Sequence, residues 1–185
     1  MNAITVLLVL VYITIIVSFI WARFRYFTFQ SSRSRISSLL YDPVIGVQVS
    51  ATLYFLIATP STYSPINAVS LVLYILCLAL FWWSVVTTEH LEFAFSDHVG
   101  KVVTTGPFAY VRHPFYLSYT LVWFGSSILF DSIFLWITLI YLTTFYLTSA
   151  KTEEEVYLKS EYSREYRDYS QKVGMFLPRI TLWKN

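Results

Sequence analysis

The sequence predicts an all-α integral membrane protein: a helical bundle of about five transmembrane helices, followed by a cytoplasmic C-terminal helical segment. The first observation is composition, because 56% of the 185 residues are hydrophobic and only 13% are charged, against roughly 25% charged in an average soluble domain. The second is that uncharged stretches between the charged clusters are long enough to cross a hydrocarbon core of about 30 Å. The third is that all thirteen Lys and Arg residues fall on one side of the predicted topology.

The uncharged stretches predict five membrane helices, at about 1-22, 43-59, 66-88, 114-130 and 132-150. The first stretch lacks a basic leader and a small-residue cleavage site, so we expect a retained helix rather than a signal peptide. Pro60 and Pro65 break the chain between the second and third helices, and Asp131-Ser132 makes a tight turn between the fourth and fifth.

This pattern divides the chain into two parts. Residues 1-99 hold the N-terminal transmembrane helices and their cytoplasmic loops, and residues 100-185 hold a core made of the last transmembrane hairpin and the C-terminal helix. The positive-inside rule places the N-terminus outside and the C-terminus in the cytoplasm. We expect a multi-pass protein of a prokaryotic plasma membrane, or otherwise of the endoplasmic reticulum.

Several classes of function are disfavoured by composition. The formal net charge is only +2 and no dense basic run is present, so we expect no nucleic-acid partner. The five glycines lie too far apart for a G-x-G-x-x-G turn or a P-loop. The single cysteine, Cys77, has no partner for an internal disulfide. His90 and His98 lack partners at metal-ligand spacing, so we interpret them as ordinary loop histidines and expect no metal site.

The first polar cluster lies within residues 100–116. Pro114 suits the first position of a helix, where its missing N–H costs nothing. Arg112 and His113 then sit at the positive end of that helix, an arrangement that can hold a carboxylate or phosphate. The alternative is that Arg112 only extends toward lipid headgroups.

The second polar cluster begins at three consecutive glutamates, Glu153-Glu154-Glu155. Carboxylates can accept hydrogen bonds from ribose hydroxyls or pair with an ammonium group; the alternative is a solvated acidic turn. The spacing of Tyr162, Tyr166 and Tyr169 predicts three phenols on one helical face. That face has an alternative interpretation too, as an amphipathic helix at headgroup level.

Together the two clusters resemble the isoprenylcysteine carboxyl methyltransferase family and its phospholipid methyltransferase relatives. The first family pattern is a valine-rich stretch, a G-[PV]-Y turn and R-H-P-x-Y, and the second is a Glu pair followed by a leucine, spaced tyrosines, a valine and a proline. The matching residues are Val102-Val103-Thr104-Thr105-Gly106-Pro107-Phe108, Arg112-His113-Pro114-Phe115-Tyr116, Glu154-Glu155, Leu158, Tyr162-Ser163, Tyr166, Tyr169, Val173 and Pro178. The resemblance covers about 80 residues, from Gly100 to Pro178.

The resemblance implies a membrane methyltransferase whose cofactor is S-adenosylmethionine, which agrees with the missing glycine-rich turn. By position, it implies cofactor contacts at Lys101, Val102, Val103, Phe108, His113, Pro114, Phe115, Tyr116 and Glu154. It implies that Arg112 holds the cofactor carboxylate or orders the loop.

This chain departs from the family pattern at four places. Phe108 replaces a tyrosine, Tyr162-Ser163 replaces F-G, and Ser118 replaces a glycine. A basic residue that the lipid-cysteine enzymes use on their substrate falls at Ala150, so Lys151 is our candidate substrate residue.

We therefore expect a membrane enzyme that methylates a lipophilic or lipidated acceptor, most like isoprenylcysteine carboxyl methylation, with membrane lipid as its surroundings. The candidate catalytic residues are Arg112, His113 and Glu155, and an amine acceptor would need a general base such as His113, Glu154 or Glu155. Phospholipid N-methylation and thiol S-methylation stay open. Alternatives of another class are an NADPH-dependent membrane reductase and a non-enzymatic membrane assembly protein.

Overall fold

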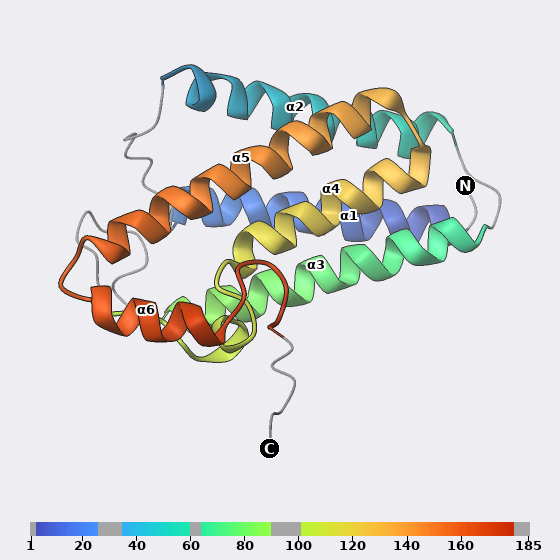
Figure 1. Cartoon of the computed structure of the whole chain (residues 1–185). Helices are drawn as coiled ribbons and strands as arrows, with labels where there is room; N and C mark the ends of the chain where they lie inside the picture. The colour runs from blue at the N-terminus through green and yellow to red at the C-terminus, as the bar shows by residue number, and fades with distance from the viewer. Residues whose placement is uncertain (1–2, 26–34, 60–63, 90–100, 180–185) are drawn as a thin grey trace.

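The computed structural model describes residues 3–25, 35–59, 64–89 and 101–179, and over these ranges the regular elements are helical. The elements are α1 (Ala3–Arg25), α2 (Arg35–Ala58), α3 (Pro65–Glu89), the 3-10 helix η1 (Gly106–Ala109), α4 (Pro114–Phe130), α5 (Ile133–Leu158) and α6 (Ser163–Lys172). The long helices α1 to α5 form one bundle, and the short α6 lies at one end of it (Figure 1). The predicted all-α fold is confirmed.

Among the described residues, four helices are long and apolar enough to cross a membrane, namely α1, α3, α5 and the part of α2 from Leu39 to Ala58. Their outer faces expose large apolar side chains such as Leu10 and Val17, as expected where lipid is the solvent. Helix α4 has 17 residues, which rise about 26 Å at 1.5 Å per residue. The chain is thus a multi-pass membrane protein. The predicted number of about five spans is approximate, because four helices qualify by length and composition and α4 is shorter.

The structure corrects the bounds of two helices. Helix α2 begins at Arg35 rather than at 43, and Pro43 lies inside it. Helix α5 runs to Leu158 rather than to 150, so the glutamates of the second cluster are helical. The reason is the same for both helices: a lack of charge marks the part of a helix inside the bilayer, whereas the helix itself continues into charged residues such as Asp42 and Glu153.

Helix α4 lies in contact with α3 on one side and with α5 on the other. The contact with α3 is close because Gly125 has no side chain: a Cβ there would lie 3.0 Å from the Tyr74 ring. Buried hydroxyls add hydrogen bonds across it, from Ser70 to the Gly125 carbonyl at 3.0 Å and between Tyr74 and Ser126 at 2.8 Å. Small residues and interhelical hydrogen bonds are what hold membrane helices together, since lipid is as apolar as the helices.

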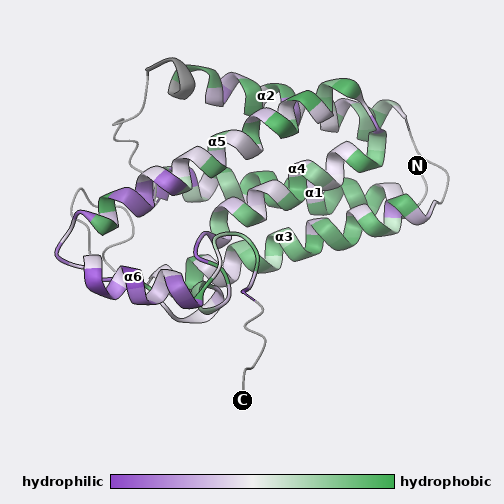
Figure 2. Cartoon of the chain, viewed as in Figure 1, coloured by the Kyte–Doolittle hydropathy of each residue, from purple (hydrophilic) through white to green (hydrophobic). Residues whose placement is uncertain are grey.

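One end of the bundle is polar. Figure 2 shows hydrophilic residues concentrated on α6 and on the C-terminal end of α5, whereas the rest of the long helices is mainly hydrophobic. We call this region, formed by residues 101–113, the end of α5 and residues 159–179, the polar end. It contains both predicted polar clusters, so the fold brings together two segments separated by a transmembrane hairpin.

The close contact between α3 and α4 predicts that a larger side chain at Gly125 lowers the stability of the protein. We expect Gly125→Val to destabilise the detergent-solubilised protein by about 1–3 kcal/mol, because the added atoms overpack a tight helix interface. Gly46→Val is the matched control, since nothing lies within 4 Å of a Cβ at Gly46. The measurement is thermal unfolding of both variants, and equal losses of stability would contradict the close contact.

Candidate active site

The glutamates at the end of α5 point in different directions because successive residues on a helix are about 100° apart. Glu153 and Glu154 turn toward the start of α4, whereas Glu155 turns away and lies 3.8 Å from Lys159 in an exposed pair. An acidic turn after the fifth helix, the alternative that the sequence left open, would not have fixed the directions of the three carboxylates. The helical continuation selects two of the three carboxylates for the site.

Arg112 is the residue around which the polar end is assembled. Its guanidinium binds the Glu154 carboxylate bidentately, with Nε and one terminal nitrogen at 2.9 and 3.1 Å from the two oxygens. Its other terminal nitrogen donates to the carbonyls of Ser170 and Val173 at the C-terminal end of α6. Only 9% of the Arg112 side chain is exposed, so the alternative in which it extends to lipid headgroups is not what the structure shows.

His113 lies between the two inward glutamates. Its Nε2 is 3.0 Å from Glu154 and its Nδ1 is 3.6 Å from Glu153. The ring is stacked on Tyr116, with centroids 5.8 Å apart, and lies 5.9 Å from the Phe176 ring. Tyr116 in turn donates its hydroxyl proton to Glu153. His113 is also the residue that precedes Pro114 at the first turn of α4, as the sequence predicted.

The segment after α6 closes the site by backbone pairing. Val111 and Gly174 form a parallel bridge, and the N–H groups of Arg112 and His113 donate to the carbonyls of Gly174 and Met175 at 2.9 and 3.1 Å. A side chain at Gly174 would collide with the Leu177 carbonyl. The bridge therefore holds the R-H-P motif against the C-terminal segment at a position that only glycine permits.

The tyrosines of α6 face inward. Tyr166 and Tyr169 are buried with Val102 and Val173, and the Tyr169 hydroxyl donates to the Phe108 carbonyl at 2.6 Å. Burial raises the pKa of both phenols well above the ordinary value, so both stay neutral. The shared helical face is confirmed, and it packs on the loop at 101–109 instead of forming the outer face of a headgroup-level helix.

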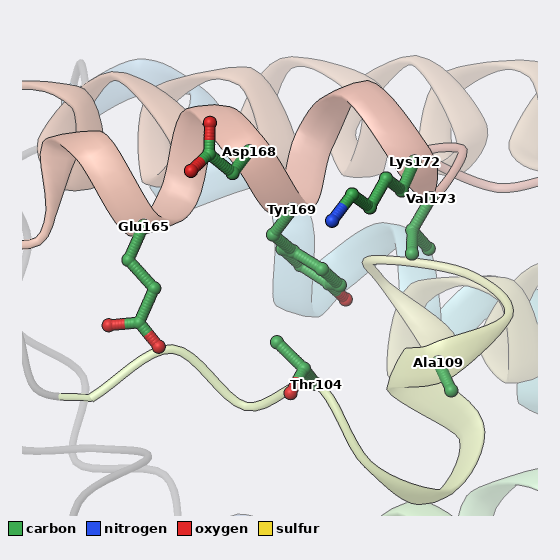
Figure 3. Close-up of a pocket in the computed structure, with 7 residues that line it drawn as sticks. All are labelled: Thr104, Ala109, Glu165, Asp168, Tyr169, Lys172 and Val173. Carbon is green, nitrogen blue, oxygen red and sulfur yellow. The ribbon is translucent and has the colours of Figure 1, made fainter.

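A groove of about 480 Å³ lies between this loop and α6. Figure 3 shows acidic and basic side chains of α6 above Thr104 of the loop. Its lining residues are Thr104, Ala109, Glu165, Asp168, Tyr169, Lys172 and Val173. None of them is among the predicted cofactor contacts, although Thr104 directly follows Val103.

The structure brings some predicted residues together and leaves others apart. Arg112, His113 and Glu154 form one hydrogen-bonded cluster. Tyr116 is hydrogen-bonded to Glu153, which lies 3.6 Å from His113 and which the sequence indicated only as one of three consecutive glutamates. Helix propensity could have indicated Glu153. A helix that continues through 153–155 places Glu153 one turn beyond Ser149, on a face of α5 that is buried.

The other predicted contacts surround this cluster at varying distance. Val102 packs against α6, and Phe108 and Phe115 lie ring to ring with centroids 6.4 Å apart. Pro114 is buried, Val103 is half-buried, and Lys101 and Lys151 are exposed. Among the described residues no group of three His, Cys, Asp or Glu side chains could hold a metal ion; His90 and His98 lie outside them.

The fold and the polar end define a class: a multi-pass helical membrane protein with an ionic cluster at one boundary of its bundle. Residues 66–165 match the family described as phospholipid methyltransferase, and the chain belongs to this family. This confirms the resemblance at the level of the family.

A curated relative agrees with this family. The chain is 33% identical over 85 residues to protein-S-isoprenylcysteine O-methyltransferase of Saccharomyces cerevisiae strain ATCC 204508 / S288c. The match covers 46% of this chain and 35% of that protein, so this chain corresponds to about a third of its relative's length.

The contacts of Arg112 predict the effect of replacing its guanidinium by the single ammonium of a lysine. We expect Arg112→Lys to destabilise the docking of α6 by roughly 1–3 kcal/mol, because a lysine keeps the charge but loses the bidentate pair and the carbonyl bonds. Hydrogen exchange of the amides of 163–173 is the measurement. Arg164→Lys, at an exposed position of α6, is the control; equal protection in both variants would contradict this role of Arg112.

Proposed function

We propose that this chain is an S-adenosylmethionine-dependent methyltransferase that moves a methyl group to a lipophilic acceptor. The observation that carries the proposal is the hydrogen-bonded cluster of Arg112, His113 and Glu154. It is built from the two motifs that resemble the family, and it lies where an apolar bundle meets a polar cap. Such a place admits a polar cofactor from water and an apolar acceptor from the bilayer.

The residues present fit this cofactor by their chemistry. The cofactor carries a carboxylate, an ammonium and two ribose hydroxyls, and the polar end offers the carboxylates of Glu153 and Glu154 for the ammonium and the hydroxyls. Apolar and aromatic surface for the adenine comes from Val102 and Phe108, which lie on the loop packed against α6. The aromatic faces of His113 and Tyr116 suit a positively charged sulfonium.

The residues that would hold the cofactor are those matched by position to the family. They are Lys101, Val102, Val103, Phe108, His113, Pro114, Phe115, Tyr116 and Glu154. When bound, S-adenosylmethionine would supply a methyl group already activated by the sulfonium charge. The chain's own task is then to align the acceptor and to exclude water, and alignment alone can lower a barrier by about 7–11 kcal/mol.

Arg112 contributes by ordering the site. The hydrogen bonds of its guanidinium go to Glu154 and to the carbonyls that end α6. This favours the second of the two roles that the resemblance implies, loop ordering, over direct binding of the cofactor carboxylate.

The methyl acceptor reaches the site from the lipid side. The relative's name is that of an enzyme acting on an isoprenylcysteine, and the family description names phospholipids; both acceptors have long apolar parts, and a lipophilic thiol is a third of the same kind. Ala150 stands where the lipid-cysteine enzymes carry a basic residue, and it is fully buried in α5. Lys151 is exposed and stays a candidate for contact with the acceptor.

We infer that the polar end faces the cytoplasm. The charge distribution supports this orientation, because the Lys and Arg residues of the sequence gather on the loops and tail at that side. The membrane is then a prokaryotic plasma membrane, or otherwise the endoplasmic reticulum.

Calorimetric binding of S-adenosylhomocysteine to the detergent-purified chain tests the proposal. We expect micromolar affinity, weakened about tenfold or more, or 1.4 kcal/mol, in His113→Ala and Glu154→Ala, because both remove groups of the cluster. Glu161→Gln, an exposed glutamate between α5 and α6, is expected to bind like the wild type.

A folded wild-type chain that does not bind this product would overturn the methyltransferase proposal. NADPH binding would then support the reductase alternative, and the absence of both would leave the membrane assembly protein. Thermal unfolding of each variant separates loss of the site from loss of the fold.

A further inference from the structure

The hydrogen bonds of His113 determine which of its nitrogens carries the proton. Glu154 is bound bidentately by Arg112, and a carboxylate paired in this way is ionised and only accepts hydrogen bonds. His113 Nε2, 3.0 Å from the same carboxylate, must therefore be the donor. In the neutral ring the lone pair is then on Nδ1.

The lone pair on Nδ1 faces a second carboxylate. Glu153 Oε2 is 3.6 Å from Nδ1, and its other oxygen accepts the hydroxyl proton of Tyr116. A lone pair and an anionic oxygen at this distance repel each other, and a proton placed on Nδ1 removes the repulsion. The arrangement is that of an oriented general base: one carboxylate fixes the tautomer and the free nitrogen takes a proton.

We propose that His113 Nδ1, assisted by Glu153, is the proton acceptor of this site, and that the methyl acceptor is a lipophilic nucleophile that must lose a proton, an amine or a thiol. The inference rests on the proposed methyl transfer and deepens it. It also assigns a role to Glu153. Glu154 is engaged with Arg112, and Glu155 faces away with 67% of its side chain exposed, so neither is placed to act as the base.

The step balances without a further reactant. A thiol gives its proton to Nδ1, the thiolate attacks the methyl carbon, and the bond from carbon to the sulfonium breaks with its electron pair going to that sulfur. An ammonium likewise gives one proton to Nδ1, and the resulting amine attacks and becomes a methylated ammonium. In both cases His113 then releases its proton to water.

The surroundings of the base favour such acceptors over a carboxylate. An ionised carboxylate needs no base and is stabilised by a nearby cation, but the position one turn before Glu154 is the buried Ala150. The neighbouring cation, Lys151, projects about 100° away on the helix and is exposed. The described charges that face His113 from α5 are both carboxylates, which favour a cationic ammonium and allow a neutral thiol.

The depth of the base suits a lipophilic acceptor. Twenty residues of helix separate Ile133 from Glu153, a rise of about 30 Å, which equals the thickness of a hydrocarbon core. The length of α5 is thus sufficient to place Glu153 at the boundary opposite the α4–α5 turn, at the level where lipid headgroups begin. An amine headgroup, or a thiol on an alkyl chain anchored in the bilayer, reaches this level without leaving the membrane.

The tautomer is tested directly by nitrogen-15 NMR of the whole chain labelled at histidine. The chain has three histidines, and the resonances lost in His113→Gln identify those of His113. We expect the neutral ring to carry its proton on Nε2. A neutral ring with its proton on Nδ1 would overturn the inference, whatever the acceptor and whether or not the cofactor binds.

The base is tested with acceptors that differ in their need for it. In lipid nanodiscs with S-adenosylmethionine, the probes are dodecanethiol, mostly protonated at neutral pH, and 4-octylthiophenol, mostly ionised there. We expect Glu153→Gln to slow methylation of the alkyl thiol at least tenfold more than that of the aryl thiol, because a general base contributes about 10²–10⁴ only where a proton must be removed. Glu153→Asp is expected to restore part of the loss, and Glu161→Gln to change neither rate.

Two further probes separate the sources of the acceptor. Phosphatidylethanolamine in the nanodisc reports a headgroup amine, and N-acetyl-S-farnesylcysteine reports a carboxylate. Methylation of the carboxylate alone, or an equal loss for both thiols in Glu153→Gln, would overturn the inference while methyl transfer stands. Failure of S-adenosylhomocysteine to bind would instead overturn the proposed function, and the NMR measurement would still decide the tautomer.

Discussion

The polar end depends on the ion pair between Arg112 and Glu154. The pair is largely withdrawn from water, with 9% and 16% of the two side chains exposed, so each charge requires the other. The guanidinium also binds two carbonyls of α6, which satisfies most of its donors. One residue thereby joins three segments that are far apart in the sequence: the loop before α4, the end of α5 and the end of α6.

The sequence predicted the membrane helices well where turn-forming residues mark their ends. Helix α4 has the predicted bounds, because Pro114 fixes its first residue and Asp131 adopts a left-handed conformation, with φ of 47°, directly after its last. Helix α5 was predicted too short, because an uncharged stretch shows only where the bilayer ends. That difference concealed Glu153, whose direction toward His113 follows only from a helix that continues through the charged residues.

The candidate site could be predicted as a set of residues but not as an arrangement. The two motifs indicated Arg112, His113 and Glu154, and the structure brings all three together. The sequence could not show that Arg112 forms its hydrogen bonds with Glu154 and α6. The contact between the loop before α4 and the end of α6 depends on the Val111–Gly174 bridge. The sequence also could not show that Ala150 and Lys151, adjacent in the chain, differ so completely in exposure.

The way in which this site is built agrees with the chemistry of the proposed cofactor. Glycine-rich turns serve to bring backbone N–H groups close to phosphates, and S-adenosylmethionine has none. Its polar groups are a carboxylate, an ammonium and hydroxyls, which side chains can recognise from rigid helices. In this fold the side chains stand at the first turn of α4 and the last turns of α5. Backbone approaches backbone closely at Gly174, where the C-terminal segment pairs with the R-H-P motif. A membrane bundle can therefore carry such a site where the start of one helix and the end of another meet at the hydrocarbon boundary, joined by a largely buried ion pair.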